Sequence, residues 1–322
     1  CTPQVVRDIE AGRSAEELWR HIEDAGFADA LVAGDDGGAG LCLADVFAVL
    51  ELCGNHALPV PLADTMLARA LLAQARIERP SGSIALAEGA RAADGGVTCD
   101  TVRSGRTADH VLATVGAESL LLLTAQATRS AAGFALDATL VWPAAAVAEA
   151  PRMAASHDVR TLHGCVHAAL LAGALMRVFE RTLQYANERS QFGRPIGKFQ
   201  AIQHQLAVIS EHAFAGRMAA QIGCQAAGTQ PDRLRVAIAK ARTSEAALEV
   251  AALSHSIHGA IGFTAEFDLQ LYTRRLHVWR QVGGSESYWH DVAGSALVDR
   301  RVGLAVDLIR VATEFSSTET ST

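Results

Sequence analysis

Three side chains that can hold a flat, charged ligand lie within four residues of one another in the C-terminal half of the chain. They are Arg189, Gln191 and Phe192, and the segment Gly-Arg-Pro-Ile-Gly follows them at 193–197. The glycines permit turn geometry and the proline forbids a continuing helix, which predicts a helix end, a tight turn and a new helix. A guanidinium can fork onto a phosphate, and an aromatic ring can lie against another ring. The segment suits a flat, phosphate-bearing cofactor, although a plain interhelical turn with one buried Phe uses the same residues.

A second glycine-rich turn favours the cofactor site over a plain interhelical turn. The stretch from Arg189 to Gly197 (RSQFGRPIG), followed by Gln200, resembles the flavin-binding turn of the acyl-CoA dehydrogenase family. The stretch from Ile257 to Thr264 (IHGAIGFT) resembles that family's second glycine-rich turn. Both occur in the family's order and at about its separation. The resemblance is strong over the C-terminal half of the chain and weaker before it.

The resemblance implies FAD as the cofactor. In the family, the first turn reaches across a subunit interface to the adenosine-diphosphate half of the neighbouring subunit's FAD. This implies cofactor contacts at four residues of the first turn and two of the second. If the two turns do not bind a cofactor, the glutamine at 200 only caps a helix and the glycine at 259 only allows a helix to end. The expected FAD contacts are Arg189, Gln191, Phe192, Gln200, His258 and Gly259.

The family's reaction removes a proton next to a thioester and transfers a hydride to flavin, which requires a positioned base. The family uses a glutamate at one of two places. The first matches the Val-Gly-Gly-Ser segment at 282–285, where Gly283 occupies the expected position. The second matches a helix that carries His163, with His167 one turn later. The catalytic residue is therefore unknown, with His163 as a candidate; a histidine on a helix stripe is also typical of a core. A gap in the alignment leaves Glu286 and Asp158 open as further candidates.

The middle of the chain departs from the family. A threonine that would face the flavin is replaced by Ala87, and the family's tryptophan-containing strand has no obvious counterpart. The segment is also shorter than the family's middle domain. The flavin wall is therefore expected to be incomplete.

These departures favour a subunit that completes the FAD site of a longer acyl-CoA dehydrogenase subunit. The arrangement resembles the α2β2 acyl-CoA dehydrogenases of bacterial steroid side-chain breakdown, in which one subunit is short and degenerate. It implies an acyl-CoA substrate, with a steroid side-chain CoA ester among the candidates, and an electron-accepting flavoprotein. One alternative is a self-sufficient homo-oligomeric dehydrogenase whose base is not placed. A second is a non-enzymatic structural helical protein. The acyl group itself is not readable from the sequence.

Composition bounds the class of protein. The 322 residues are 50% hydrophobic with a net charge of −7, which allows a large core and argues against nucleic acid as the partner. None of the six cysteines has metal-site spacing, so free thiols in a reducing cytoplasm are expected, with no metal. No signal peptide and no apolar run long enough to span a bilayer are expected. The chain begins at Cys1, which suggests a processed or trimmed start.

Periodicity and turn residues predict the elements that position these groups. Helices are expected over about 5–27, 45–53 and 65–75, and strands over 84–87, 110–115, 120–124 and 139–142. Long helices are expected over 158–187, 199–227, 234–258, 266–282 and 286–312, with Asp232 as a cap. The predicted fold is mainly α and acyl-CoA dehydrogenase-like. Its parts are an N-terminal helical domain (1–79), a shortened β domain (80–150), a C-terminal antiparallel four-helix bundle (151–315) and a disordered tail (316–322).

A run of basic residues is a further candidate for a binding site. Thr273, Arg274 and Arg275, with Arg280 five residues later, lie on the fourth helix of the predicted bundle. The run suits contact with coenzyme A phosphates or with another subunit. A solvated helix face has the same composition.

Overall fold

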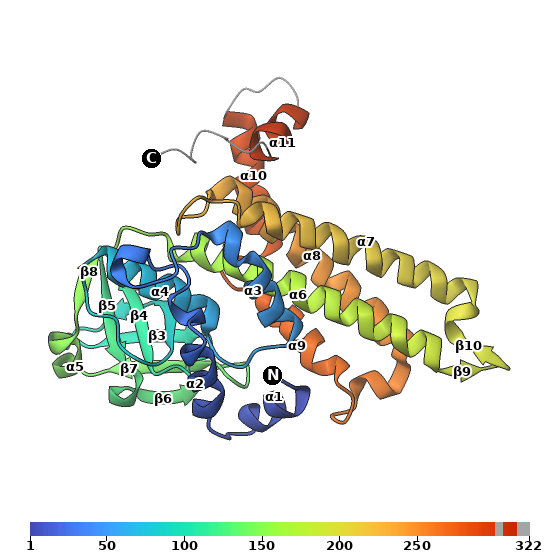
Figure 1. Cartoon of the computed structure of the whole chain (residues 1–322), viewed down its shortest axis with the longest axis horizontal. Helices are drawn as coiled ribbons and strands as arrows, with labels where there is room; N and C mark the ends of the chain where they lie inside the picture. Colours follow the sequence, from blue (N-terminus) through green and yellow to red (C-terminus); the bar gives the residue numbers. More distant parts are fainter. Residues whose placement is uncertain (300–304, 314–322) are drawn as a thin grey trace. The chain divides into compact units, whose positions relative to one another are not determined.

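The chain forms two compact units. The computed structural model describes residues 1–299 and 305–313. The first unit comprises residues 1–46 and 58–159, and the second comprises residues 47–57 and those from 160 onward. In the first unit, helices precede residue 80 and strands predominate after it, whereas the second unit is mainly helical (Figure 1).

The first predicted helix is two helices. We expected one helix over 5–27, but α1 (Pro3–Glu10) and α2 (Glu16–Asp24) are separated by a turn. The break lies at Gly12, whose φ of 109° is in the region that favours glycine. The Ser14 side chain then accepts a hydrogen bond from the Glu16 amide (3.2 Å), which helps to begin α2.

The remaining N-terminal helices lie close to their predicted positions. The helix α3 spans Leu43–Asn55, and α4 spans Leu62–Gln74, beginning directly after Pro61. Every residue of α4 from 62 to 73 is buried. Two short 3₁₀ turns, η1 (Phe27–Asp29) and η2 (Gly34–Asp36), lie between α2 and α3.

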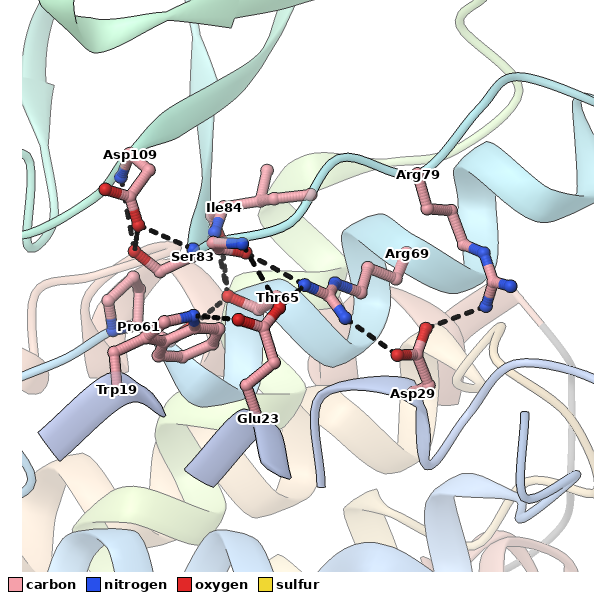
Figure 2. A network of polar contacts seen from close by, with 11 residues as sticks. Trp19, Glu23, Asp29, Pro61, Thr65, Arg69, Arg79, Ser83, Ile84 and Asp109 are labelled. Atoms are coloured by element: carbon pink, nitrogen blue, oxygen red, sulfur yellow. Dashed lines mark hydrogen bonds and ion pairs between the residues drawn. The ribbon is translucent and has the colours of Figure 1, made fainter. Parts of the chain in front are cut away.

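A buried arginine on α4 joins these pieces (Figure 2). Arg69 is 4% exposed and pairs with Glu23 on α2 and with Asp29 at the end of η1 (2.7 Å). It also donates to the Gly82 carbonyl oxygen (3.1 Å). Arg79 pairs with the other oxygen of Asp29 (2.7 Å). Three segments that are far apart in sequence are therefore fixed around one guanidinium, whose fork suits several acceptors.

The β region consists of two four-stranded sheets. The strand order is β1-β4-β5-β8 in one and β2-β3-β7-β6 in the other, and every pairing is antiparallel except that of β1 with β4. The four predicted strands are present, and four shorter or more polar strands were not predicted. The strands are β1 (Ile84–Glu88), β2 (Ala90–Arg91), β3 (Val97–Val102), β4 (His110–Val115), β5 (Glu118–Leu123), β6 (Thr128–Ala131), β7 (Ala138–Trp142) and β8 (Arg152–Ala154).

Residues from both sheets share one core. Ala87 is 3% exposed and pairs in register with Ala113 on β4. Trp142 on β7 is fully buried and donates from its indole nitrogen to the Leu123 carbonyl oxygen (2.8 Å). These residues belong to a single apolar cluster, to which the short helix α5 (Ala144–Glu149) also contributes. β1 is the edge strand of its sheet, and its residues 84–87 are nevertheless all buried.

The second unit is the predicted helical bundle. Its long helices α6, α7 and α8 follow one another through short connections, and α9 and α10 complete it (Figure 1). The predicted helix over 266–282 is shorter, and the one predicted over 286–312 is described as α10 and α11. The predicted tail lies outside the described residues. The helices are α6 (Val159–Glu188), α7 (Gln200–Gly223), α8 (Arg233–His258), α9 (Leu269–Trp279), α10 (Glu286–Asp299) and α11 (Ala305–Thr313).

Glycines let these helices approach closely. A Cβ on Gly173 of α6 would lie 1.9 Å from the Glu51 carbonyl oxygen of α3, and one on Gly54 would lie 1.9 Å from that of Leu170. Asp232 caps α8 as predicted, because its side chain accepts a hydrogen bond from the Arg235 amide (2.8 Å).

The helix α6 has the length and composition of a membrane-spanning helix. An 18-residue window of its 30 residues has a mean hydropathy of 1.5, so the expectation that no run is long enough was wrong. Within the protein, 78% of that window is buried. Because the bundle already covers the apolar face, α6 has the character of a core helix.

Candidate functional site

The turn between α6 and α7 is a tight β-hairpin. Its strands are β9 (Ser190–Gln191) and β10 (Arg194–Pro195), and Phe192 and Gly193 form the tip with φ values of 52° and 79°. Two consecutive positive φ angles are typical of a two-residue hairpin of the I′ type. Phe192 is unusual there, because a bulky residue with positive φ is strained.

The hairpin tip presents an aromatic ring to solvent. Phe192 is 90% exposed, and its ring meets the edge of Phe199 at a centroid distance of 6.1 Å. On the same Phe199 ring lies the guanidinium of Arg194, 4.2 Å from the centroid. Phe199 therefore supports two neighbours at once. The alternative of a plain interhelical turn with a buried Phe192 does not match this geometry.

The other residues of this turn flank the hairpin. Arg189 follows the last residue of α6, and its carbonyl oxygen accepts a hydrogen bond from the Ile196 amide (2.8 Å). Gln200 is the first residue of α7. The side chains of Arg189, Gln191 and Gln200 are all exposed. They are near Phe192 in sequence and, like its ring, are accessible to a ligand.

The two predicted turns lie together. Tyr185, one turn before Arg189 on α6, stacks on His258 at the end of α8 with a centroid distance of 4.3 Å. The Tyr185 hydroxyl also donates to the His258 carbonyl oxygen (3.4 Å). Gly259 follows with a φ of 64° and starts the 3₁₀ turn η5 (Gly259–Phe263). The structure thus brings the residues of both glycine-rich turns to the same end of the bundle.

The His258 ring is buried and is held by one hydrogen bond to the backbone. Its Nδ1 bonds to the Ser254 carbonyl oxygen (2.7 Å), which fixes that nitrogen as the donor. Burial lowers the pKa of His258, and the side chain is only 4% exposed. Its Nε2 is buried and has no hydrogen-bond partner among the described residues. In a neutral ring whose Nδ1 donates, Nε2 is the nitrogen that can accept a hydrogen bond.

The position expected to carry the catalytic glutamate lies against the backbone of α6. Gly283 has a φ of 67°, and a Cβ there would lie 2.8 Å from the Gly164 amide nitrogen and 2.9 Å from the Arg160 carbonyl oxygen. The same Cβ would lie 3.1 Å from Cβ of His163. Both expected base positions therefore come together, but side chains larger than hydrogen do not fit at 283 without movement.

The other base candidates are buried or engaged. His163 is 9% exposed and packs edge-to-face on His167, with a centroid distance of 5.6 Å. Glu286 forms an ion pair with Arg280.

One functional-type residue was not predicted. Lys240 on α8 is fully buried and donates to the Ser244 hydroxyl (2.9 Å), the Arg280 carbonyl oxygen (2.8 Å) and the Gly284 carbonyl oxygen (3.2 Å). Burial lowers its pKa to about 7. These three contacts occupy the Lys240 amino group and hold the turn beside Gly283 against α8. A lysine among the alanines of α8 was the only sequence signal.

The predicted basic run is not one surface. Arg274 is exposed, whereas Arg275 is 1% exposed and donates to the Leu271 carbonyl oxygen (3.0 Å). Arg280 is engaged by Glu286. Within the described residues, these arginines therefore do not form one solvated helix face. They do not form a shared phosphate site on this helix either.

Comparisons with known proteins place this architecture. The model of the family described as acyl-CoA dehydrogenase, C-terminal domain, matches residues 163–297. Acyl-CoA dehydrogenase IpdE2 of Mycobacterium tuberculosis is 32% identical over 264 residues, which cover 81% of this chain and 80% of the relative. The protein of the same name from Mycolicibacterium smegmatis is 32% identical over 292 residues, which cover 88% of this chain and 89% of the relative. The chain belongs to the acyl-CoA dehydrogenase family.

Solved structures share the fold. The ChsE4–ChsE5 complex from Mycobacterium tuberculosis contains a chain that matches with a TM-score of 0.79 at 24% identity, over 93% of both chains. The Tcur3481–Tcur3483 steroid acyl-CoA dehydrogenase variant matches with a TM-score of 0.77 at 23% identity, over 93% of this chain and 94% of that one. The predicted fold class is confirmed: the chain is mainly helical with an acyl-CoA dehydrogenase fold.

Proposed function

We propose that this chain is a subunit of an FAD-dependent acyl-CoA dehydrogenase and that it completes the FAD site of a longer catalytic partner. The reaction is α,β-dehydrogenation of an acyl-CoA thioester to a trans-2-enoyl-CoA. When bound, FAD supplies the hydride acceptor for this reaction. A steroid side-chain CoA ester is the substrate we favour, because one structure of the same fold is described as a steroid enzyme.

The observation that carries the proposal is the hairpin tip. Phe192 keeps a strained backbone and exposes 90% of its surface, although burial or replacement by glycine would be more favourable. Strain and an exposed aromatic side chain together are typical of a binding position. A partner surface that covers the ring would account for both the strained backbone and the exposed side chain of Phe192.

The side chains around the tip fit the adenosine-diphosphate half of FAD. The exposed guanidinium of Arg189 suits the diphosphate, and Phe192 offers a flat apolar surface. Gln191 and Gln200 add exposed amides, which can both donate and accept. His258 supplies an unpaired buried acceptor near the second turn, at Gly259. The set combines one cation, one ring and neutral polar groups, as a dinucleotide requires.

The packing at Gly283 favours a partner that supplies the base. In this chain, the turn lies against α6 with no space for a side chain, and Lys240 holds it there. Proton abstraction by a carboxylate on this turn is therefore assigned to the longer subunit. A structure of the same fold that is described as a complex of two named chains supports such pairing.

Two further assignments follow from the same reading. The six cysteines are free thiols, which supports a reducing compartment such as the cytoplasm. Reoxidation of the reduced cofactor requires an electron acceptor, and we assign this role to an electron-accepting flavoprotein.

Flavin absorbance of the purified chain, with and without its longer partner co-expressed, tests the proposal. Flavin is expected only in the mixed complex, and Arg189→Ala is expected to lower its flavin content while leaving the fold intact. Arg20→Ala, which removes an exposed arginine from α2, is the matched control and should change nothing.

Two outcomes overturn the proposal. If the chain alone holds flavin that an acyl-CoA bleaches, it is a self-sufficient homo-oligomeric dehydrogenase. If the mixed complex carries no flavin, the hairpin has another purpose.

A further inference from the structure

Two buried cysteines face each other inside the bundle. Cys165 lies on α6, and Cys224 is the residue that ends α7. Their sulfur atoms are 3.6 Å apart, and the side chains are 1% and 0% exposed. Cys165 also directs its thiol toward the Gly223 carbonyl oxygen (3.5 Å). The two thiols therefore touch each other across the contact between two helices.

The separation is within reach of a covalent bond. A disulfide needs a sulfur–sulfur distance of about 2.05 Å, so the two sulfurs must approach by roughly 1.5 Å. Cys224 has left the regular helix, because it is the C-cap of α7, with φ of −90° and ψ of 1°. A residue at a helix end can adjust more easily than one within the helix, because helix ends fray.

The surroundings of the pair slow its oxidation. The contact with Cys224 and burial raise the pKa of the Cys165 thiol well above its ordinary value. A protonated, buried thiol reacts slowly, because the thiolate is the nucleophile. Oxidation therefore requires a transient opening at the end of α7, or exposure of the pair during folding.

We propose that Cys165 and Cys224 form a reversible disulfide that joins α6 to the end of α7 under oxidising conditions. This modification site is independent of the proposed flavin function. The chemistry balances by thiol–disulfide exchange with a low-molecular-weight disulfide. One cysteine thiolate attacks that disulfide, which releases one thiol, and the second cysteine then attacks the mixed disulfide and releases the other. The two cysteines lose two protons and two electrons, and the reagent is reduced to two thiols.

The bond would close a long loop. The two residues are 59 positions apart, and the segment between them contains the hairpin and all of α7. Closing a long loop restricts the unfolded chain, which raises the unfolding temperature if the native geometry tolerates the bond. We expect a rise in the unfolding midpoint of roughly 5 °C or more.

Disulfide mapping tests the proposal. The full chain, in the assembly in which it purifies, is incubated with the aromatic disulfide dithiodipyridine, unfolded in the presence of an alkylating agent and digested without reductant. We expect a cross-linked peptide that contains Cys165 and Cys224, together with the rise in unfolding midpoint, and we expect dithiothreitol to reverse both. Cys53→Ser removes another buried thiol of the same unit and should preserve both results.

Single substitutions make the assignment specific. Cys165→Ser and Cys224→Ser should each abolish the cross-link and the rise in midpoint. Should either variant fail to fold, mapping of the unsubstituted chain still decides the question. The proposal is overturned if both cysteines are recovered as alkylated thiols or as mixed disulfides at a dose that fully modifies the exposed Cys1.

Discussion

Gly283 and Arg160 are in backbone contact: a Cβ on Gly283 would lie 2.9 Å from the Arg160 carbonyl oxygen. Real Cβ atoms essentially never come this close to another heavy atom of the chain. The contact joins the turn between α9 and α10 to the start of α6. It also leaves no space at residue 283 for the glutamate side chain that the family resemblance led us to expect there.

Replacing Gly283 should therefore destabilise the chain. For Gly283→Ala we expect a loss of about 2–4 kcal/mol in the free energy of unfolding, because the new methyl group meets backbone atoms at a positive φ. Gly294→Ala is the matched control within α10, where a Cβ meets no atom within 4 Å. It should stabilise by roughly 0.5–1 kcal/mol, because alanine favours helix. Urea unfolding measures both, and equal effects of the two substitutions would refute the packing argument.

Phe192→Gly should separate stability from cofactor binding. Glycine accepts the φ of 52° without strain, and the 90% exposed ring contributes little burial. We expect the free energy of unfolding to stay within about 1 kcal/mol of the original value, or to rise. Loss of the aromatic contact should weaken flavin retention by the complex by about 2–10-fold. Phe214→Ala removes an exposed ring from α7 and serves as the control for flavin content. Unchanged flavin retention in Phe192→Gly would remove the hairpin tip from the site.

Lys240 should make stability depend on pH. Its pKa is lowered from 10.5 to about 7 in the folded chain, so between these values the unfolded chain binds one more proton than the folded chain. Stability therefore rises with pH across this window, by up to ~1.4 kcal/mol per pH unit. The stabilising contribution is complete above 10.5 and is lost as pH falls through about 7.

Comparison with the Lys240→Met variant isolates the contribution of Lys240 to the pH dependence of stability. Unfolding midpoints in urea at several pH values from 7 to 9 should rise more steeply for the original chain than for the variant. Parallel profiles would mean that the lysine keeps an ordinary pKa in the folded chain.

Arg69 should be more important for stability than the other arginines of the first unit. Arg69→Met leaves Glu23 and Asp29 without their buried partner, and we expect a loss of about 3–5 kcal/mol. Arg76→Ala removes an ion pair with Asp36 whose arginine side chain is 83% exposed. That change should cost less than about 1 kcal/mol. Thermal or urea unfolding of the two variants measures the difference, and comparable losses would show that burial of the pair is not what matters.

The sequence predicted elements more reliably than their ends. The long helices have strong apolar stripes, and α6 was predicted within one residue at each end. The break at Gly12 was missed because apolar residues on both sides share a helical spacing, whereas the positive φ of one glycine ends the helix. The short strands β2 and β6 were missed because exposed strands at sheet edges lack apolar alternation.

Sequence motifs and tertiary geometry identified different residues of the candidate site. The residues of both turns were recognisable from their types and spacing, and Tyr185 and His258 then bring those turns together. Lys240 was overlooked because a lysine in a helix is normally exposed. Its burial depends on carbonyl groups that are 40 and 44 residues away in sequence.

The sequence by itself determined the helices, the glycine turns and the family, because helical periodicity, turn residues and motif spacing are local properties of the chain. Only the tertiary structure decided that Phe192 is exposed, that Gly283 lies on Arg160, and that Cys165 meets Cys224. Each of these features results from the packing of segments that are distant from one another in sequence. Packing depends on the shapes of all neighbours at once, and no local pattern encodes it.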